Sequence, residues 1–154
     1  KIAWFMKAIH ENANLADTIE GMRIQIADSM TFARQYVKGY RNPKDIFYLL
    51  KAATRYKHDP PGVELLQSMQ TLLTDANYWG IPGAGDCDCF TIAYTACMKA
   101  VNIPVKIVLA GRRKNEFVHV YNVVRLYGED IPADLTNAEF GTERPYLYHR
   151  EIKI

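Results

Sequence analysis

The sequence lacks the features that identify a protein's role most directly. It has three cysteines, an odd number without paired spacing, which argues against a disulfide framework and favours a reducing compartment or a functional thiol. No apolar run approaches the roughly 18 residues of a membrane span. The apolar start at residues 2–6 is interrupted by Lys7 and is too short for a signal-peptide core. No glycine-rich loop precedes a Lys-Ser or Lys-Thr pair, so a phosphate-binding loop is not predicted.

An excess of charge of one sign is also missing. The 154 residues carry 19 basic and 17 acidic side chains, which are interspersed and give a formal net charge of +2. Neither a nucleic acid nor a membrane surface is therefore indicated as a partner. With 49% hydrophobic residues the chain can bury a core. We expect one domain over residues 1–154, located in the cytoplasm, and no motif points to a cofactor.

Apolar residues recur at three- and four-residue steps through most of the N-terminal half. The pattern predicts helices over residues 2–10, 15–40, 42–53, 63–73 and 87–100. On the first of these, one face is formed by Ile2, Phe5, Met6 and Ile9. The third has the strongest start signal, because Asn42 can cap the helix and Pro43 follows at its first position.

From residue 103 the period of the apolar pattern changes from 3.6 to 2, which is typical of strands. The pattern predicts strands over residues 103–110, 117–124 and 131–135, joined by turns. The chain thus divides into a helical part (1–76), a core (77–140) and an irregular tail (141–154). A helical half followed by an antiparallel meander predicts an α+β fold.

Cys87 lies where a glycine-rich run, residues 80–85, gives way to the last predicted helix. In the first turn of that helix its sulfur would lie beside free N–H groups and the positive end of the helix dipole, which lowers a thiol pKa. Asp86 and Asp88 push the pKa of the thiol the other way, so a paired base is needed. The glycine-rich run is interpreted as a flexible approach to an active site.

His119 is the best candidate for that base. It lies on the second predicted strand, on the same face as Phe117 and Tyr121. Asp134, on the next strand, would fix the tautomer of the imidazole and stabilise the imidazolium. A lone strand histidine is often structural and an aspartate at a strand end is usually a turn residue. The assignment therefore requires a fold that brings Cys87, His119 and Asp134 together.

The other two cysteines are interpreted as core residues. Cys97 lies in mid-helix among alanines, and Cys89 points to a different helix face from Cys87. A Cys-x-Cys pair without a second close pair is poor spacing for zinc, so no metal site is predicted.

Four segments resemble motifs of the transglutaminase-like superfamily, in that family's order. They read Gly85-Asp86-Cys87-Asp88-Cys89-Phe90, then Asn102-Ile103-Pro104-Val105, then His119-Val120-Tyr121, and finally Asp134-Leu135-Thr136. The resemblance covers about residues 77–140 and implies a papain-like fold. It also implies that Cys87 is the nucleophile, His119 the base and Asp134 the orienting residue.

The sequence departs from the family's pattern at three positions. Asn102, Cys89 and Leu135 stand where the family usually has glycine, aspartate and proline. Further upstream, residues 59–68 resemble a segment of small bacterial and phage members. A virion-associated protein is therefore a second expectation for the location.

These residues and the resemblance together predict a thiol acyl-transfer enzyme that acts on a protein or peptide. Cys87 would attack a carboxamide or peptide carbonyl and form a thioester, which water or a lysine amine then resolves. Hydrolysis by a cysteine peptidase or amidase is preferred, because so short a chain lacks the extra domains of large crosslinking enzymes. One alternative is a protein-glutamine gamma-glutamyltransferase, a transglutaminase. The other is a catalytically silent binding or virion structural module.

Two donors are expected to hold the oxyanion of such a reaction. The first is the backbone N–H of Cys87, and the second is the side-chain amide of Gln67, with Trp79 as the alternative. Tyr78, Trp79 and Tyr121 are candidates for an aromatic slot that receives the acyl donor or the amine.

Overall fold

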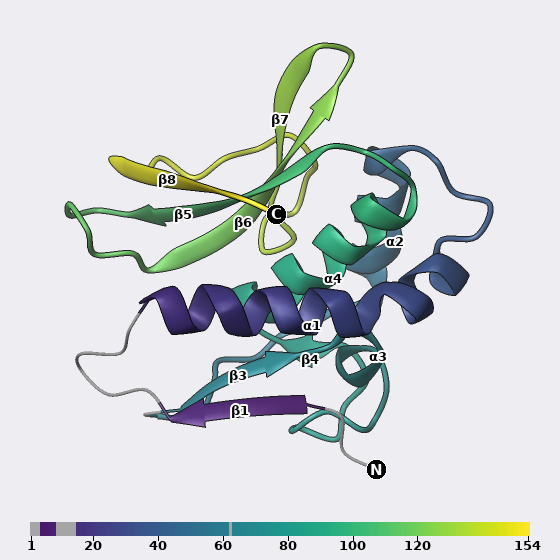
Figure 1. Cartoon of the computed structure of the whole chain (residues 1–154), viewed down its shortest axis with the longest axis horizontal. Coiled ribbons are helices and arrows are strands. Elements are labelled where there is room, and N and C mark those ends of the chain that lie inside the picture. Colours follow the sequence, from purple (N-terminus) through teal and green to yellow (C-terminus); the bar gives the residue numbers. More distant parts are fainter. Residues whose placement is uncertain (1–3, 9–14, 62) are drawn as a thin grey trace.

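The computed structural model of the chain describes residues 4–8, 15–61 and 63–154. The described residues form an α+β architecture with the helices mainly in the N-terminal half, as predicted. Its helices are α1 (Leu15–Tyr36), α2 (Pro43–Ala53), α3 (Met69–Leu72) and α4 (Cys87–Ala100). Figure 1 shows α1 crossing in front of α4, with the larger sheet on one side of the two helices and a strand pair on the other.

The larger sheet is antiparallel, with strand order β7-β6-β5-β8. Its strands are β5 (Val105–Gly111), β6 (His119–Leu126), β7 (Glu129–Ala133) and β8 (Tyr148–Lys153). Strands β5, β6 and β7 form the predicted meander, and a two-residue turn with positive φ at Tyr127 and Gly128 joins the last two. On the other side of the helices, β1 (Trp4–Ala8) pairs antiparallel with β3 (Val63–Gln67). Two short strands, β2 (Arg55–Tyr56) and β4 (Ala84–Gly85), pair in parallel.

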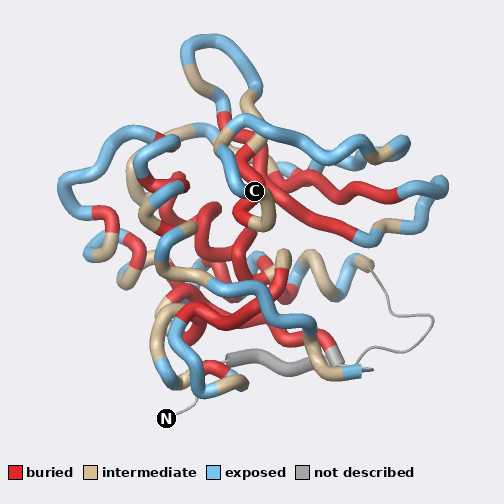
Figure 2. Tube along the Cα trace, turned by 180° about the vertical axis from the view of Figure 1, so that it is seen from behind, coloured by how far each residue is buried: buried red, intermediate tan, exposed pale blue. Residues whose placement is uncertain are grey.

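The core lies around α4. Every residue of this helix from 89 to 98 is buried, and the tube in Figure 2 shows the buried segments meeting in the interior while the turns are exposed. Met22 and Ile26 of α1 pack with Ile92 of α4 and Ile107 of β5. The nucleophile candidate therefore begins a helix that is enclosed by α1 and the sheet.

Two buried hydrogen bonds fix how α4 lies on β6. The hydroxyl of Thr91 donates to the backbone oxygen of Val120 at 3.3 Å, and Nδ2 of Asn122 donates to Oγ1 of Thr95 at 2.8 Å. All four residues are buried. A slip of α4 along β6 would leave these groups unpaired, at about 1–3 kcal/mol for each buried group.

The start of α2 confirms the predicted cap. Oδ1 of Asn42 accepts a hydrogen bond from the N–H of Lys44 at 2.8 Å, and Pro43 is the first helical residue. Helix α4 has the predicted bounds, and α1 ends at Tyr36, four residues before the predicted end. No helix in the described parts of the chain is long and apolar enough to cross a membrane.

The predicted helix over residues 2–10 is wrong where the structure describes it. Residues 4–8 form β1, in which Phe5 lies opposite Leu66 of β3. Ile2 and Ile9, which were assigned to the same helical face, lie outside the described residues. A short apolar run fits both periods, and here the pairing with β3 decides.

The predicted helix over residues 63–73 is wrong for its first half. Residues 63–67 form β3, and only Met69–Leu72 is helical, with the Ser68 hydroxyl accepting from the N–H of Thr71 at 3.3 Å. Leu65 and Leu66 are both fully buried. A strand covered on both faces shows no alternation, so its pattern resembles that of a buried helix.

The glycine-rich run, which the sequence suggested was a flexible approach, is held by backbone hydrogen bonds at its end. Its end forms β4, and it accepts two backbone hydrogen bonds at β2, from Arg55 N to Gly83 O at 2.9 Å and from Lys57 N, just after β2, to Gly85 O at 2.8 Å. The expected irregular tail is also wrong in part, because Tyr148–Lys153 forms β8 along β5. Five of the six residues of β8 are exposed, which leaves no apolar alternation to detect.

Replacing Gly83 by alanine is expected to destabilise the protein much more than the same change at Gly39. Both glycines have positive φ, 86° and 90°, but a Cβ at Gly83 would lie 2.0 Å from the backbone oxygen of Ala53, whereas nothing lies within 4 Å at Gly39. We expect Gly83→Ala to lower the free energy of unfolding by about 3 kcal/mol and Gly39→Ala by about 1 kcal/mol, measured by urea unfolding. Equal losses would contradict the close approach of Gly83 to the backbone of Ala53.

Candidate active site

A cavity of about 690 Å³ lies between the first turns of α1, the turn that joins β5 to β6, and the start of α4. Leu15 and Met22 of α1 supply an apolar wall on one side, and Phe117 supplies apolar surface beside β6. Cys87 and His119, which are 32 positions apart in the sequence, both line this cavity. The fold therefore brings the predicted nucleophile and the predicted base to one space.

Cys87 is held at the cavity wall by the two residues that precede it. Asp86 caps α4, since its Oδ1 accepts from the N–H of Asp88 at 3.2 Å. Gly85 packs so closely that a Cβ at this position would lie 2.8 Å from Cδ1 of Leu72 and 3.0 Å from Cβ of Cys89. A side chain at position 85 would therefore displace Leu72 and crowd Cys89, so glycine fits best directly before the cap.

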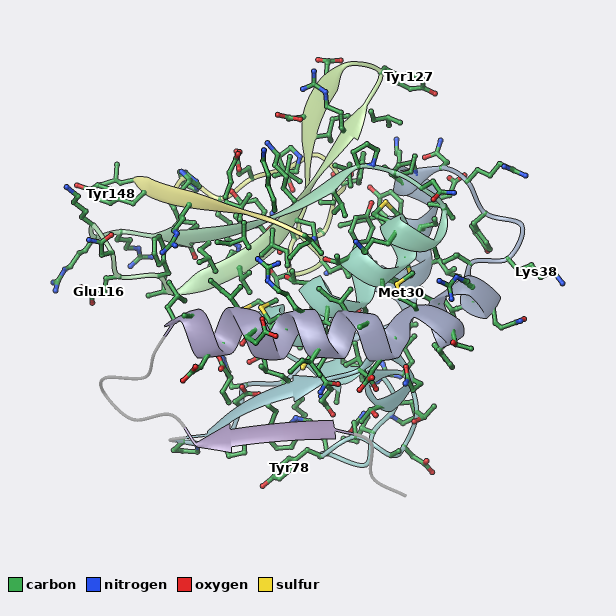
Figure 3. The ribbon with its side chains drawn as sticks, in the orientation of Figure 1. Met30, Lys38, Tyr78, Glu116, Tyr127 and Tyr148 are labelled. Carbon is green, nitrogen blue, oxygen red and sulfur yellow. The ribbon has the colours of Figure 1, made fainter. Side chains whose placement is uncertain are left out.

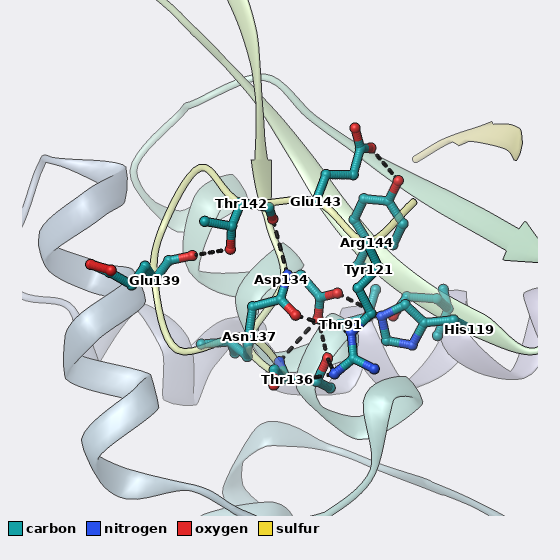
Figure 4. A network of polar contacts seen from close by, with 12 residues as sticks. Thr91, His119, Tyr121, Asp134, Thr136, Asn137, Glu139, Thr142, Glu143 and Arg144 are labelled. Carbon is teal, nitrogen blue, oxygen red and sulfur yellow. Dashed lines mark hydrogen bonds and ion pairs between the residues drawn. The ribbon is translucent and has the colours of Figure 1, made fainter. Parts of the chain in front are cut away.

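His119 and Asp134 form a close buried pair. His119 begins β6 and Asp134 follows the last residue of β7, and their atoms Nε2 and Oδ2 lie 2.6 Å apart (Figure 4). The other oxygen, Oδ1, accepts from the N–H of Thr136 at 3.0 Å and from its hydroxyl at 2.7 Å. Burial raises the pKa of Asp134, but the hydrogen bonds from His119 and Thr136 outweigh it and lower the pKa. The carboxylate is thus held in its charged form, and Nδ1 is the ring nitrogen of His119 left for proton transfer.

The sulfur of Cys87 lies beside β6. The backbone N–H of Val120, the residue after His119, is close enough to lower the pKa of the thiol. Burial, followed by the carboxylates of Asp88 and Asp86, has the larger effect and raises the pKa of the thiol well above its usual value. The rise caused by Asp88 and Asp86 agrees with the effect that the sequence predicted for these two residues. Because burial, followed by the two aspartates, disfavours the charged thiol, a thiolate at neutral pH requires a positively charged partner.

Carboxylates gather at the same wall of the cavity. Burial and the neighbouring carboxylates raise the pKa of Asp86 and of Asp88 well above the usual value, and burial raises that of Asp59. Glu64, whose Oε2 accepts from the hydroxyl of Thr18 at 2.8 Å, shares a hydrogen bond with Asp88. The cluster therefore retains protons that isolated carboxyl groups would release.

These carboxylates are also where a metal ion could be held. Ligand atoms of Asp59, Asp86 and Asp88 lie within 4.8 Å of one another, and no other group with such spacing is found among the described residues. Oxygen ligands suit hard cations such as Ca²⁺ and Mg²⁺. Cys87 and Cys89, the pair considered for zinc, do not form such a group with a histidine of the described chain.

Gln67 and Trp79 do not line the cavity. Gln67 is fully buried, its Nε2 lies 3.4 Å from the sulfur of Cys89, and its Oε1 accepts from the N–H of Tyr78 at 3.3 Å. The Trp79 ring lies 5.8 Å from the ammonium of Lys57. The structure therefore brings neither of the two side chains considered as second oxyanion donor to the cavity.

The suggested aromatic slot is not found at the cavity either. The hydroxyl of Tyr121 donates to Glu143, and neither Tyr121 nor Tyr78 lines the cavity. In Figure 3, Tyr78 lies near β1, far from Glu116 on the cavity's rim. Tyr56 of β2 lines the cavity instead, and the sequence analysis missed it. A two-residue strand has no periodicity, and only its pairing with β4 brings Tyr56 near Cys87.

Cys89 and Cys97 are buried in the core, as predicted. The thiol of Cys89 donates to the backbone oxygen of Leu65 at 3.3 Å, and the sulfur of Cys97 lies 3.8 Å from that of Met69. Cys87 is the one partly exposed thiol of the three. Only Cys87 is therefore placed to meet a substrate.

Comparisons with known proteins relate the fold to two solved structures. A proposed cysteine protease from Cytophaga hutchinsonii matches with a TM-score of 0.51 and 16% identity, over 86% of this chain and 49% of that one. A proposed protease from Parabacteroides distasonis matches with a TM-score of 0.53 and 13% identity, over 80% of this chain and 26% of that one. LapG of Legionella pneumophila gives a TM-score of 0.45 and 15% identity, over 80% of this chain and 73% of that one.

Comparisons of the amino-acid sequence alone give no match. No protein-family model matches it, and no curated protein matches it significantly. The chain spans about half the length of the Cytophaga protein and about a quarter of the Parabacteroides protein. At these identities, the comparisons with these two proteins show a shared fold.

Replacing Asp88 by asparagine is expected to stabilise the protein at neutral pH. Because the pKa of Asp88 is raised on folding, its contribution to stability is present at low pH and is lost as the pH rises through the folded-state pKa. Asparagine is neutral at every pH and can still donate to Glu64. We expect Asp88→Asn to raise Tm by about 2–4 °C at pH 7.5, and the gain to shrink below pH 5.

This measurement is made in EDTA, so that no stray cation neutralises the cluster. Asp75→Asn, a change at an exposed residue, serves as the control and should shift Tm little at either pH. An Asp88→Asn gain of the same size at pH 4 and pH 7.5 would show that the charge of Asp88 is not its cause.

Proposed function

We propose that this chain is a thiol enzyme of the cysteine peptidase type, which hydrolyses a peptide or amide bond through a thioester on Cys87. The observation that carries the proposal is the 2.6 Å hydrogen bond between His119 and Asp134 at a cavity that Cys87 also lines. The fold shared with the proposed protease from Cytophaga hutchinsonii is consistent with this chemistry. The substrate class, a protein or peptide, is part of the proposal.

In the proposed reaction, Nδ1 of His119 first takes the proton of the Cys87 thiol, which gives a thiolate and an imidazolium. The imidazolium offsets the two aspartates that disfavour the thiolate, and Asp134 stabilises the imidazolium through Nε2. The sulfur adds to the carbonyl carbon, His119 returns the proton to the leaving amine, and the C–N bond breaks. A water molecule, deprotonated by His119, then cleaves the thioester.

The oxyanion of the tetrahedral intermediate needs hydrogen-bond donors. The backbone N–H of Cys87, at the first position of α4, remains the proposed first donor. For the second we propose the hydroxyl of Tyr56, which lines the cavity with Cys87. Burial, followed by the nearby Cys87 and the carboxylates, raises the pKa of Tyr56, so the phenol keeps its proton and can donate.

Iodoacetamide is expected to alkylate Cys87 far faster than Cys97 at pH 7. Cys97 is fully buried, whereas Cys87 is partly exposed and paired with His119 in the proposal. His119→Ala should lower the alkylation rate of Cys87 by about 10-fold or more, because the thiol then loses its charged partner. Peptide mass spectrometry measures both cysteines in one sample. Equal, slow alkylation of both would favour a catalytically silent module.

A second experiment separates hydrolysis from crosslinking. In the transglutaminase alternative, a lysine amine instead of water resolves the thioester. A glutamine-containing peptide is offered with and without a primary amine. Ammonia release without amine incorporation indicates hydrolysis, and incorporation of the amine indicates crosslinking.

Tyr56→Phe tests the second donor. Loss of one oxyanion donor is expected to lower kcat by about 10²-fold while KM changes little, because the bond forms only in the transition state. Tyr40→Phe, at a similarly exposed tyrosine outside the cavity, is the matched control. A Tyr56→Phe variant with wild-type kcat would exclude Tyr56 as an oxyanion donor.

A further inference from the structure

The segment between β7 and β8 contacts residues of the candidate site but does not line the cavity. We call residues 140–146 of this segment the strap. It forms neither helix nor strand, and most of it is exposed. Even so, three of its side chains, Glu143, Arg144 and Tyr146, make contacts that lead to His119 or Asp134.

Arg144 begins a chain of hydrogen bonds that ends at the imidazole (Figure 4). Its Nη2 donates to Oγ1 of Thr136 at 3.1 Å, and its Nε donates to Oδ1 of Asn137 at 3.0 Å. The hydroxyl of Thr136 has a single proton. Because this hydroxyl accepts from Arg144, its own proton points to Oδ1 of Asp134, 2.7 Å away. The other carboxylate oxygen of Asp134, Oδ2, is hydrogen-bonded to Nε2 of His119.

The strap also holds the imidazole from its side. The ring of Tyr146 lies 5.8 Å from that of His119, tilted by 31°, and the ring of Tyr121 is stacked on His119 at 5.6 Å. The carboxylate of Glu143 accepts a hydrogen bond from the hydroxyl of Tyr121. The rings of Tyr121 and Tyr146 therefore restrict the orientation of the imidazole. Tyr146 belongs to the strap, and Tyr121 is hydrogen-bonded to Glu143 of the strap.

We propose that Arg144 is a positioning residue, which acts through Thr136 and Asp134 to hold the imidazole of His119 in the orientation that pairs it with Cys87. The inference rests on the function proposed above and adds a residue outside the Cys-His-Asp set. Arg144 does not line the cavity, so it acts only through the residues that it holds. An exposed arginine that merely stabilised the surface would leave the reactivity of Cys87 unchanged.

The test measures the rate of alkylation of Cys87 by iodoacetamide between pH 5 and pH 9. Arg144→Gln should slow the reaction at pH 7 by about 10-fold and move the midpoint of the pH profile upward, because a loosely held imidazole stabilises the thiolate less. Arg144→Lys keeps the charge without the fork of donors and should recover part of the rate. The matched control is Arg125→Gln, which removes an exposed arginine bonded to Asp130 on the same sheet.

Thr136→Val tests the same series of hydrogen bonds without changing a residue of the strap. It should reproduce the effect of Arg144→Gln, and the double variant should be no slower than either single one, because both changes break one path. Thr136→Ser should restore the rate. Thermal unfolding shows whether Arg144→Gln folds. If it does not, the alkylation rates of the Thr136 variants and of Arg144→Lys test the positioning role.

The outcomes separate this inference from the proposed function. If His119→Ala slows alkylation while Arg144→Gln and Thr136→Val behave like Arg125→Gln, the positioning role is wrong and the proposed function stands. If His119→Ala leaves the pH profile unchanged, the pairing of His119 with Cys87 is wrong and both proposals fail. Additive effects in the double variant would likewise overturn the single path through Thr136.

Discussion

The register of α4 on β6 decides whether a site exists in this protein. Cys87 begins the helix and His119 begins the strand, so any slip between the two elements separates the thiol from the imidazole. The hydrogen bonds of Thr91 and Asn122 across this interface remove that freedom, since a shifted helix would leave buried polar groups without partners. Packing alone would tolerate small shifts more readily, because apolar contacts are not directional.

The carboxyl groups around Cys87 lower the stability of the folded protein at neutral pH and disfavour the thiolate form of Cys87. Asp86 and Asp88 flank the cysteine in a buried cluster, and every pKa shift there opposes the charged form. A protein selected for stability alone would not place carboxyl groups there. In the proposed mechanism the imidazolium of His119 supplies the positive charge that favours the thiolate. Burial and these carboxyl groups would hold the thiol protonated whenever the imidazole is turned away.

The sequence predicted the parts of this structure that depend on local patterns. The break before Cys87, the cap at Asn42 and the alternation around His119 lie within short windows, and the elements they predict are found. The family resemblance pairs Asp134 with His119, and the two side chains are hydrogen-bonded in the structure. Whether these residues catalyse a reaction stays a prediction.

The parts that the sequence did not predict depend on distant partners. β1 is a strand because β3 lies beside it, and β8 is a strand because β5 offers an edge. Tyr56 reaches the site only through the pairing of β2 with β4. Arg144 bonds to Thr136, only eight positions away, but it lies outside any helix or strand, so no periodicity marks it. Gln67 was favoured for the chemistry of its amide, but its β-strand directs that amide into the core, toward Cys89.

The burial of Cys89 also determines how the site responds to oxidants. A sulfenic acid formed on a cysteine is usually rescued by a second thiol that condenses with it. Cys89 is turned into the core, and Cys97 lies buried more than two helical turns further along α4. An oxidised Cys87 would therefore have no resolving cysteine within the described chain. Its recovery would depend on a small thiol entering the cavity, and without one oxidation would proceed to the irreversible sulfinic acid.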